Sequence, residues 1–165
     1  MALGPVQMLV VGFDDPKFTG RIASELERLR DLDVIRLIDL LVVQKDDEGN
    51  VTALQVSDLD DDEATEFGAI VGALIGFGME GDEGIEAGAV VGVEAMEDGH
   101  AIGDEEMWYV ADVIPSGSAA AIALIEHRWA IPLRDAIVDA GGGVVADEWI
   151  HAKDLVAVGM LAAAD

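Results

Sequence analysis

The chain has 165 residues, a length that fits one domain with a core of ordinary size. It contains no cysteine, which excludes disulfides, thiolate nucleophiles and cysteine-ligated metal sites. Its formal net charge of -25 repels nucleic acids and anionic membrane surfaces, so neither is expected as a partner, whereas cations and basic proteins are favoured. Hydrophobic residues make up 52% of the chain, which argues against disorder despite this charge.

The first third of the sequence has the pattern of a strand, a helix and a β-hairpin. An apolar run over residues 6–13 is typical of a buried strand. Asp15 followed by Pro16 predicts the start of a helix, and an apolar stripe continues it to about Leu32. Two further strands, separated by an acidic turn that contains a glycine, are expected over residues 34–45 and 51–56.

Six glycines recur at intervals of four in the middle of the chain: Gly68, Gly72 and Gly76, then Gly84, Gly88 and Gly92. Glycine costs roughly 1 kcal/mol relative to alanine in a helix interior, so this repeat needs a structural reason. Such spacing places the glycines on one face of each helix, where another helix can approach closely. We therefore predict a glycine-zipper helical hairpin within residues 62–98, with its acidic tip at residues 80–83.

Either the other helix of the hairpin or a second copy of the chain could fill these glycine faces. Many apolar side chains surround the glycines, and a hairpin has only one internal seam. The surface left over favours packing between subunits. The expected oligomer interface comprises the six zipper glycines with Ile70, Leu74, Ile75 and Phe77.

The last third predicts a short helix, a strand, a second helix, a further strand and a terminal helix. We expect them over residues 104–114, 118–126, 129–140, 144–150 and 153–161. Together with the first third, these elements form two split β-α-β units. They predict a single α+β domain over residues 1–165, a ferredoxin-like sandwich with its helices on one face of a mainly antiparallel sheet. The hairpin is expected as an insertion between the two halves.

Several segments resemble a bacterial family of small α+β proteins of unknown function. They are GPVQMLVVGF, RLIDLLVVQKDDEGNVTAL, the zipper glycines and IPSGSAAAIALIEHRW. The resemblance covers most of the chain and implies an α+β body with a glycine-rich helical hairpin, but no functional residue. Some members are labelled membrane proteins from hydropathy. Here the uncharged run over residues 67–79 is shorter than the roughly 18–20 residues needed to span a bilayer.

No combination of residues predicts catalysis, and no cofactor is expected. His100, His127 and His151 lack the spacing of metal ligands. Ser116 and Ser118 precede a strand, whereas a nucleophile elbow follows one.

An acidic cluster at Asp58, Asp60 and Asp62 resembles the start of a calcium-binding loop. The sixth and twelfth positions of that motif should be glycine and glutamate, but here they are Glu63 and Ala69. The cluster is therefore only a weak candidate for a metal site.

Taken together, these features favour a cytoplasmic, non-enzymatic, homo-oligomeric structural or assembly protein. The alternative is a small-ligand or divalent-cation-binding module of ferredoxin-like type, which would use the sheet face or the acidic cluster.

The charge predicts that stability rises with ionic strength. Screening relieves repulsion within the folded chain, because the Debye length falls from about 10 Å at about 0.1 M salt to about 3 Å at about 1 M. Thermal unfolding should therefore show a midpoint that increases with potassium chloride concentration. A midpoint that stays level or falls would contradict this reading of the charge.

Overall fold

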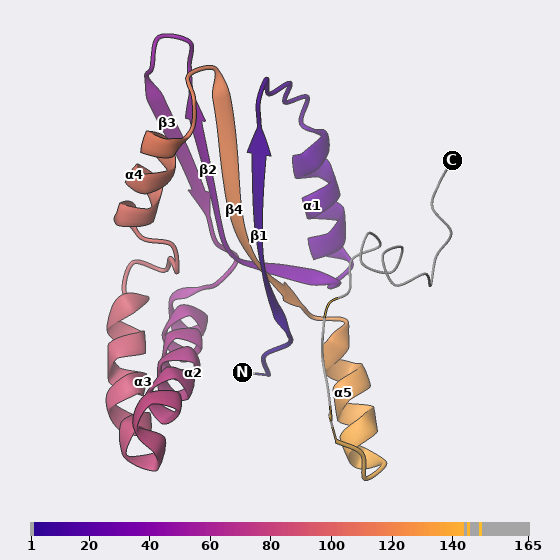
Figure 1. Cartoon of the computed structure of the whole chain (residues 1–165). Coiled ribbons are helices and arrows are strands. Elements are labelled where there is room, and N and C mark those ends of the chain that lie inside the picture. Colours follow the sequence, from indigo (N-terminus) through magenta and orange to yellow (C-terminus); the bar gives the residue numbers. More distant parts are fainter. Residues whose placement is uncertain (1, 144, 146–148, 150–165) are drawn as a thin grey trace, which may run out of the picture. The chain divides into compact units, whose positions relative to one another are not determined.

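The computed structural model describes residues 2–143, 145 and 149 (Figure 1). The strand expected over 144–150 and the helix expected over 153–161 lie almost wholly outside these residues, as does His151. The chain divides into two compact units, residues 1–132 and 133–165, and the first contains the whole sheet. The single domain expected over 1–165 stays a prediction.

The elements follow one another as the periodicity of the sequence indicates. In chain order they are β1 (Val6–Phe13), α1 (Arg21–Asp31), β2 (Ile35–Lys45), β3 (Val51–Val56), α2 (Asp61–Glu80), the 3-10 turn η1 (Gly81–Glu83), α3 (Gly84–Ala95), α4 (Asp104–Val113), β4 (Ser118–His127) and α5 (Ala130–Asp139).

The four described strands form one antiparallel sheet in the order β1-β4-β2-β3. The connection from β1 to β2 contains α1 and passes across β4. The connection from β3 to β4 contains the helical hairpin and α4 and passes across β2. The expected α+β class and the first split connection, β1-α1-β2, are therefore confirmed, whereas the second expected unit, with its strand over 144–150, stays a prediction; among the described strands β1 and β3 are at the edges.

A β-bulge allows β2 to be buried on both faces. The register with β4 moves from Leu37↔Ile125 to Asp39↔Leu124, so Ile38 is the extra residue. Because neighbouring residues of a strand point to opposite faces, Ala123 and Leu124 belong to different cores. Ala123 packs in a cluster with two leucines of α1, whereas Leu124 packs with the hairpin base and with α4.

Helices consequently cover both faces of the sheet, and the expectation that they lie on one face is wrong. The physical reason lies in β2, which is apolar along most of its length and needs cover on each side.

The helix start predicted at Asp15 and Pro16 is also wrong. α1 begins at Arg21, after Gly20, whose left-handed φ of 82° separates the helix from the preceding segment. Phe18 instead stacks edge-on against Phe13 of β1, with ring centroids 5.1 Å apart. This aromatic contact holds residues 14–20 along the end of the strand.

His127, at the end of β4, is held as a neutral ring. The indole Nε1–H of Trp129 donates to Nδ1 of His127 at 3.2 Å, so the proton of the neutral ring belongs on Nε2, which lies 3.0 Å from Oε1 of Gln7. Burial of the imidazole lowers the pKa of His127 below its ordinary value of about 6.5.

This lowered pKa predicts a pH-dependent term in stability. The unfolded chain binds a proton at His127 at a higher pH than the folded chain does. The contribution of the neutral ring is therefore fully present above about pH 6.5 and is lost as the pH falls through the folded pKa. We expect the unfolding free energy of His127→Gln to decline less than that of the wild type between about pH 7 and about pH 5. Denaturant titrations of both proteins measure the difference, and parallel declines would contradict the assignment.

Candidate functional site

Helices α2 and α3 pack backbone against backbone along the zipper glycines. Three pairs face each other: Gly68 with Gly92, Gly72 with Gly88, and Gly76 with Gly84. A Cβ atom added to any of the six would overlap the carbonyl oxygen of its opposite number. Only glycine allows this approach, which explains why the sequence accepts six helix-destabilising residues here.

The glycine seam therefore lies inside one hairpin. The sequence is compatible with a seam inside one hairpin and with a seam between two subunits, and its many apolar side chains favoured a seam between subunits. In the structure, the opposite helix of the same chain fills the glycine faces. The glycines that were predicted to form an oligomer interface pack against the opposite helix of the same chain. Any self-association therefore has to use the outer surface of the hairpin.

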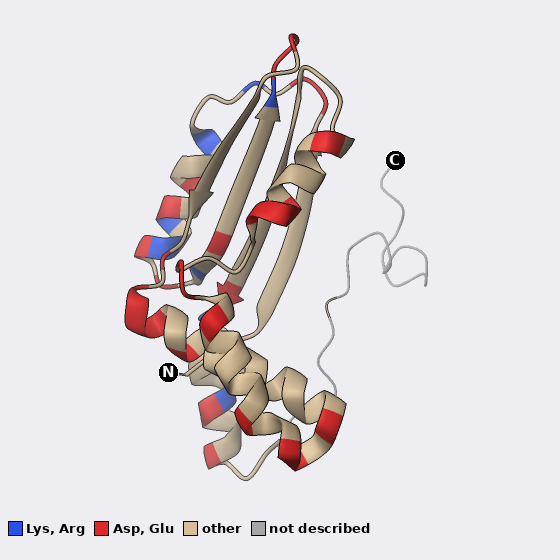
Figure 2. Cartoon of the chain, turned by 90° about the vertical axis from the view of Figure 1, so that its left-hand side faces the viewer, with Lys and Arg blue, Asp and Glu red and all other residues tan. Residues whose placement is uncertain are grey.

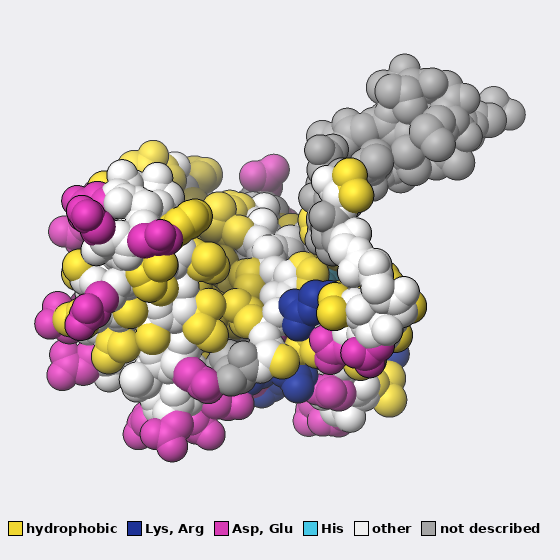
Figure 3. All heavy atoms as spheres, turned by 90° about the horizontal axis from the view of Figure 1, so that it is seen from below, with side chains coloured by type: hydrophobic (Ala, Val, Ile, Leu, Met, Phe, Trp, Pro, Cys, Tyr) yellow, Lys and Arg dark blue, Asp and Glu magenta, His cyan; other side chains and the backbone are white. Residues whose placement is uncertain are grey.

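That outer surface is strongly apolar. Of the four side chains predicted to join the glycines in an interface, Leu74, Ile75 and Phe77 are exposed and Ile70 is half-buried. Sequence reasoning left Met79 out of that interface, although it is exposed beside them. On α3 the exposed apolar side chains are Ile85, Val90 and Val91. Figure 3 shows hydrophobic side chains grouped over the hairpin, with acidic side chains around them.

A shallow groove follows one side of the glycine seam. It has a volume of about 250 Å³, and Ile75, Met79, Ala87 and Val91 line it together with four of the glycines and Glu80. The absence of side chains at the glycines produces this depression. Another apolar helix or side chain could lie in it.

Charge is confined to the ends of the hairpin and to two positions on α3. Residues 67–79 and 87–93 carry no charged side chain. The acidic residues lie in the first two turns of α2, at the tip and at Glu86 and Glu94 (Figure 2). The middle of the hairpin is thus an uncharged surface in a chain of net charge -25.

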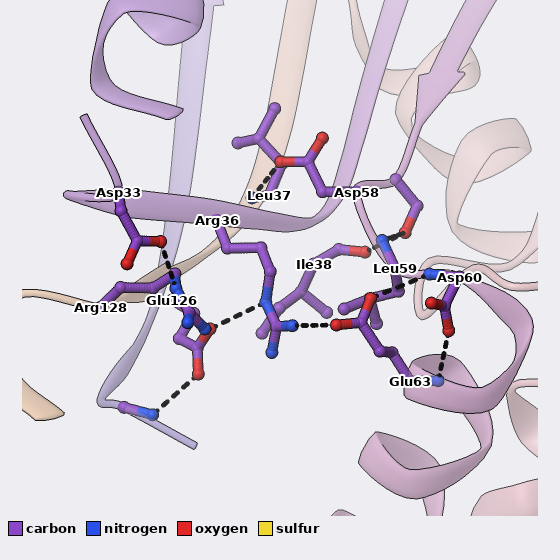
Figure 4. A network of polar contacts seen from close by, with 12 residues as sticks. Asp33, Arg36, Leu37, Ile38, Asp58, Leu59, Asp60, Glu63, Glu126 and Arg128 are labelled. Atoms are coloured by element: carbon purple, nitrogen blue, oxygen red, sulfur yellow. Dashed lines mark hydrogen bonds and ion pairs between the residues drawn. The ribbon is translucent and has the colours of Figure 1, made fainter. Parts of the chain in front are cut away.

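The base of the hairpin is tied to the sheet by ion pairs. Arg36 on β2 donates from Nη1 to Glu63 of α2 at 2.9 Å and from Nε to the buried Glu126 of β4 at 2.9 Å (Figure 4). Glu63 also completes a capping box with Asp60 at the start of α2. The hairpin therefore has a fixed attachment.

The weak metal candidates have structural roles instead. Asp58 accepts hydrogen bonds from the Arg30 guanidinium and from the backbone N–H of Leu37, and Asp60 caps α2. Asp62 lies exposed in the first turn of the same helix, where its charge is favourable to the helix dipole. Among the described residues no three His, Asp or Glu side chains come together as a metal site requires.

Sequence reasoning missed one buried polar cluster. Asp39 is fully buried, and its Oδ1 lies 3.1 Å from Nδ1 of His100. Its Oδ2 accepts from Nε2 of Gln55 at 2.9 Å and from the backbone N–H of Ile102 at 2.8 Å. The sequence does contain a signal for this cluster. Asp39 interrupts the apolar run of β2, and a buried carboxylate requires hydrogen-bond partners.

A carboxylate that orients an imidazole is an arrangement also found in general bases. In the described part of the chain, however, no hydroxyl group hydrogen-bonds to the His100 ring. The cluster instead fastens the loop between α3 and α4 to the middle of the sheet.

No described helix has both the length and the apolar character needed to cross a bilayer.

Comparison of the chain with protein-family models, curated proteins and solved structures gave no match. The family resemblance inferred from the sequence stays a prediction, and the functional argument depends on the geometry alone.

The internal seam predicts opposite effects at two glycines of α2. An added methyl group at Gly72 meets the backbone of α3, whereas at Gly78 it meets nothing within 4 Å. We expect Gly72→Ala to destabilise the protein by about 1–3 kcal/mol or more, because rigid backbone must move apart. Gly78→Ala should be neutral or stabilising by up to about 1 kcal/mol, since alanine favours the helix.

Denaturant unfolding followed by circular dichroism measures both variants. Equal effects at the two positions would mean that the seam does not form within the hairpin.

Proposed function

We propose that this protein is a non-enzymatic assembly protein, and that the outer surface of its hairpin packs against the hairpin of a second copy. One observation carries the proposal: the glycine seam is satisfied internally, and seven large apolar side chains remain exposed on the outside. Contiguous exposed apolar surface of this kind is characteristic of interaction sites.

A second copy fits this surface better than a charged partner does. The central part of each helix is uncharged, so a basic protein finds no carboxylate there. Two hairpins can bring their neutral parts together and keep their acidic ends in solvent. Close backbone packing also makes each hairpin a rigid unit, which lowers the entropy lost on association.

The alternative, a small-ligand or divalent-cation module, has less support. Asp58 and Asp60 already bind other groups of the protein. The two split β-α-β connections support relating the fold to a ferredoxin-like sandwich with an inserted hairpin, as a proposal about fold rather than ligand.

Self-association should be measurable by analytical ultracentrifugation at roughly tens of micromolar protein. We expect an oligomer that strengthens as potassium chloride rises, because salt screens repulsion between acidic copies. Leu74→Glu should weaken it by placing a charge in the interface. Leu54→Glu, at a similarly exposed position on β3, is the matched control and should not.

A wild-type protein that is strictly monomeric at these concentrations would overturn the proposal. Equal weakening by Leu74→Glu and Leu54→Glu would show that net charge, rather than the hairpin surface, controls association.

A further inference from the structure

We propose that the groove between helix α4 and strands β1 and β4 binds a small organic cation that carries an alkyl chain, of the alkyltrimethylammonium class. The groove offers an apolar floor to the chain and two carboxylates, those of Glu105 and Glu106, to the charge. This inference goes beyond the proposed function, which uses the outer surface of the hairpin and no small molecule.

The groove forms where the cover that α4 gives to the sheet ends. One side of α4 packs on an inner strand, where Ala111 lies in a buried cluster with Leu41 and Val43 of β2. Figure 2 shows the helix lying over this face of the sheet. β1 lies beyond that contact, because β4 separates it from β2. The resulting groove has a volume of about 590 Å³, within the range of roughly 300–1,000 Å³ that is typical of small-molecule sites.

The floor of the groove is apolar and has a gap at Gly12. Val10 pairs with Ile122, and Gly12 pairs with Ala120, so these four residues lie on one face of the sheet. The remaining aliphatic lining residues are Val11, Val110, Val113 and Ile114. A Cβ atom added to Gly12 would meet nothing within 4 Å. The missing side chain therefore leaves room for an alkyl chain.

The only charges that line the groove are negative. Glu105 and Glu106 are exposed lining residues, and no lysine, arginine or histidine lines the groove with them. Neither carboxylate forms a hydrogen bond or ion pair with another described residue. The N-terminal end of α4 contributes only about half a positive charge, which two carboxylates outweigh. The groove and the net charge of -25 therefore both attract a cation.

Tyr109 connects the charged part of the groove to the apolar part. Residues four apart lie on one face of a helix, so Glu105, Tyr109 and Val113 form a row along α4 from charged to aliphatic. The face of a tyrosine ring attracts quaternary ammonium groups. An ammonium group beside Glu105 and Tyr109 leaves its alkyl chain along Val113, over the apolar floor.

This arrangement selects an organic cation rather than a metal ion. Among the described residues no three carboxylates or imidazoles come together, and a hydrated metal ion gains nothing from an apolar floor.

Isothermal titration calorimetry of the full chain with hexyltrimethylammonium chloride tests the site. We expect saturable binding that weakens as added salt screens the carboxylates. Tetramethylammonium carries the charge without the chain, and hexanol carries a chain without the charge. Each should bind several-fold more weakly, and equal binding of either compound would overturn the proposal.

Gly12→Leu locates the binding site, because its side chain enters the groove from an open position on the floor. Glycine weakens the interior of a strand, so this variant should fold and lose most of the binding. Glu105→Gln and Glu106→Gln should each weaken binding several-fold. Asp112→Asn is the matched control, since it removes one charge from the same helix at a position that does not line the groove, and should bind as the wild type does.

Two variants separate this inference from the proposed function. Leu74→Glu should keep the binding of hexyltrimethylammonium, and Gly12→Leu should keep the self-association of the hairpin, so failure of either idea gives its own pattern. The proposal is overturned if the wild type shows no saturable binding, or if Gly12→Leu binds as tightly as Asp112→Asn.

Discussion

The buried carboxylate of Glu126 is the interaction on which the rest of the structure depends. It has no exposure to solvent, and it accepts hydrogen bonds from the backbone of Gly4, from Arg36 and from Arg128. A buried charge is tolerable only with such partners, and removing one of them weakens its compensation. Since Arg36 also holds Glu63 at the base of α2, one network joins β4, β2, the segment that precedes β1 and the hairpin (Figure 4).

The hairpin attached there shows a consequence of glycine packing. Two helices that touch through glycine backbones bury few side chains between them, so most of the large apolar residues between the glycines lie at the sides and outside. A seam of larger side chains would have buried them. The same glycines therefore provide a rigid hairpin and leave an apolar surface exposed on its outside.

The distribution of charge explains where copies of so acidic a protein could meet. With a net charge of -25, association is opposed everywhere except where both surfaces are neutral. The middle of the hairpin is an uncharged surface of this kind, and it belongs to the first unit.

The sequence by itself determined the local elements: the strands, the β-hairpin, and the helices with glycines on one face. These depend on residues within a few positions of each other, so periodicity reveals them. Tertiary structure alone decided that the glycine seam closes inside one chain, that the bulge at Ile38 divides the helices between two faces, and that α1 starts after Gly20. It also paired Arg36 with Glu126, 90 residues apart, because a buried charge selects its partner by position in space rather than in sequence.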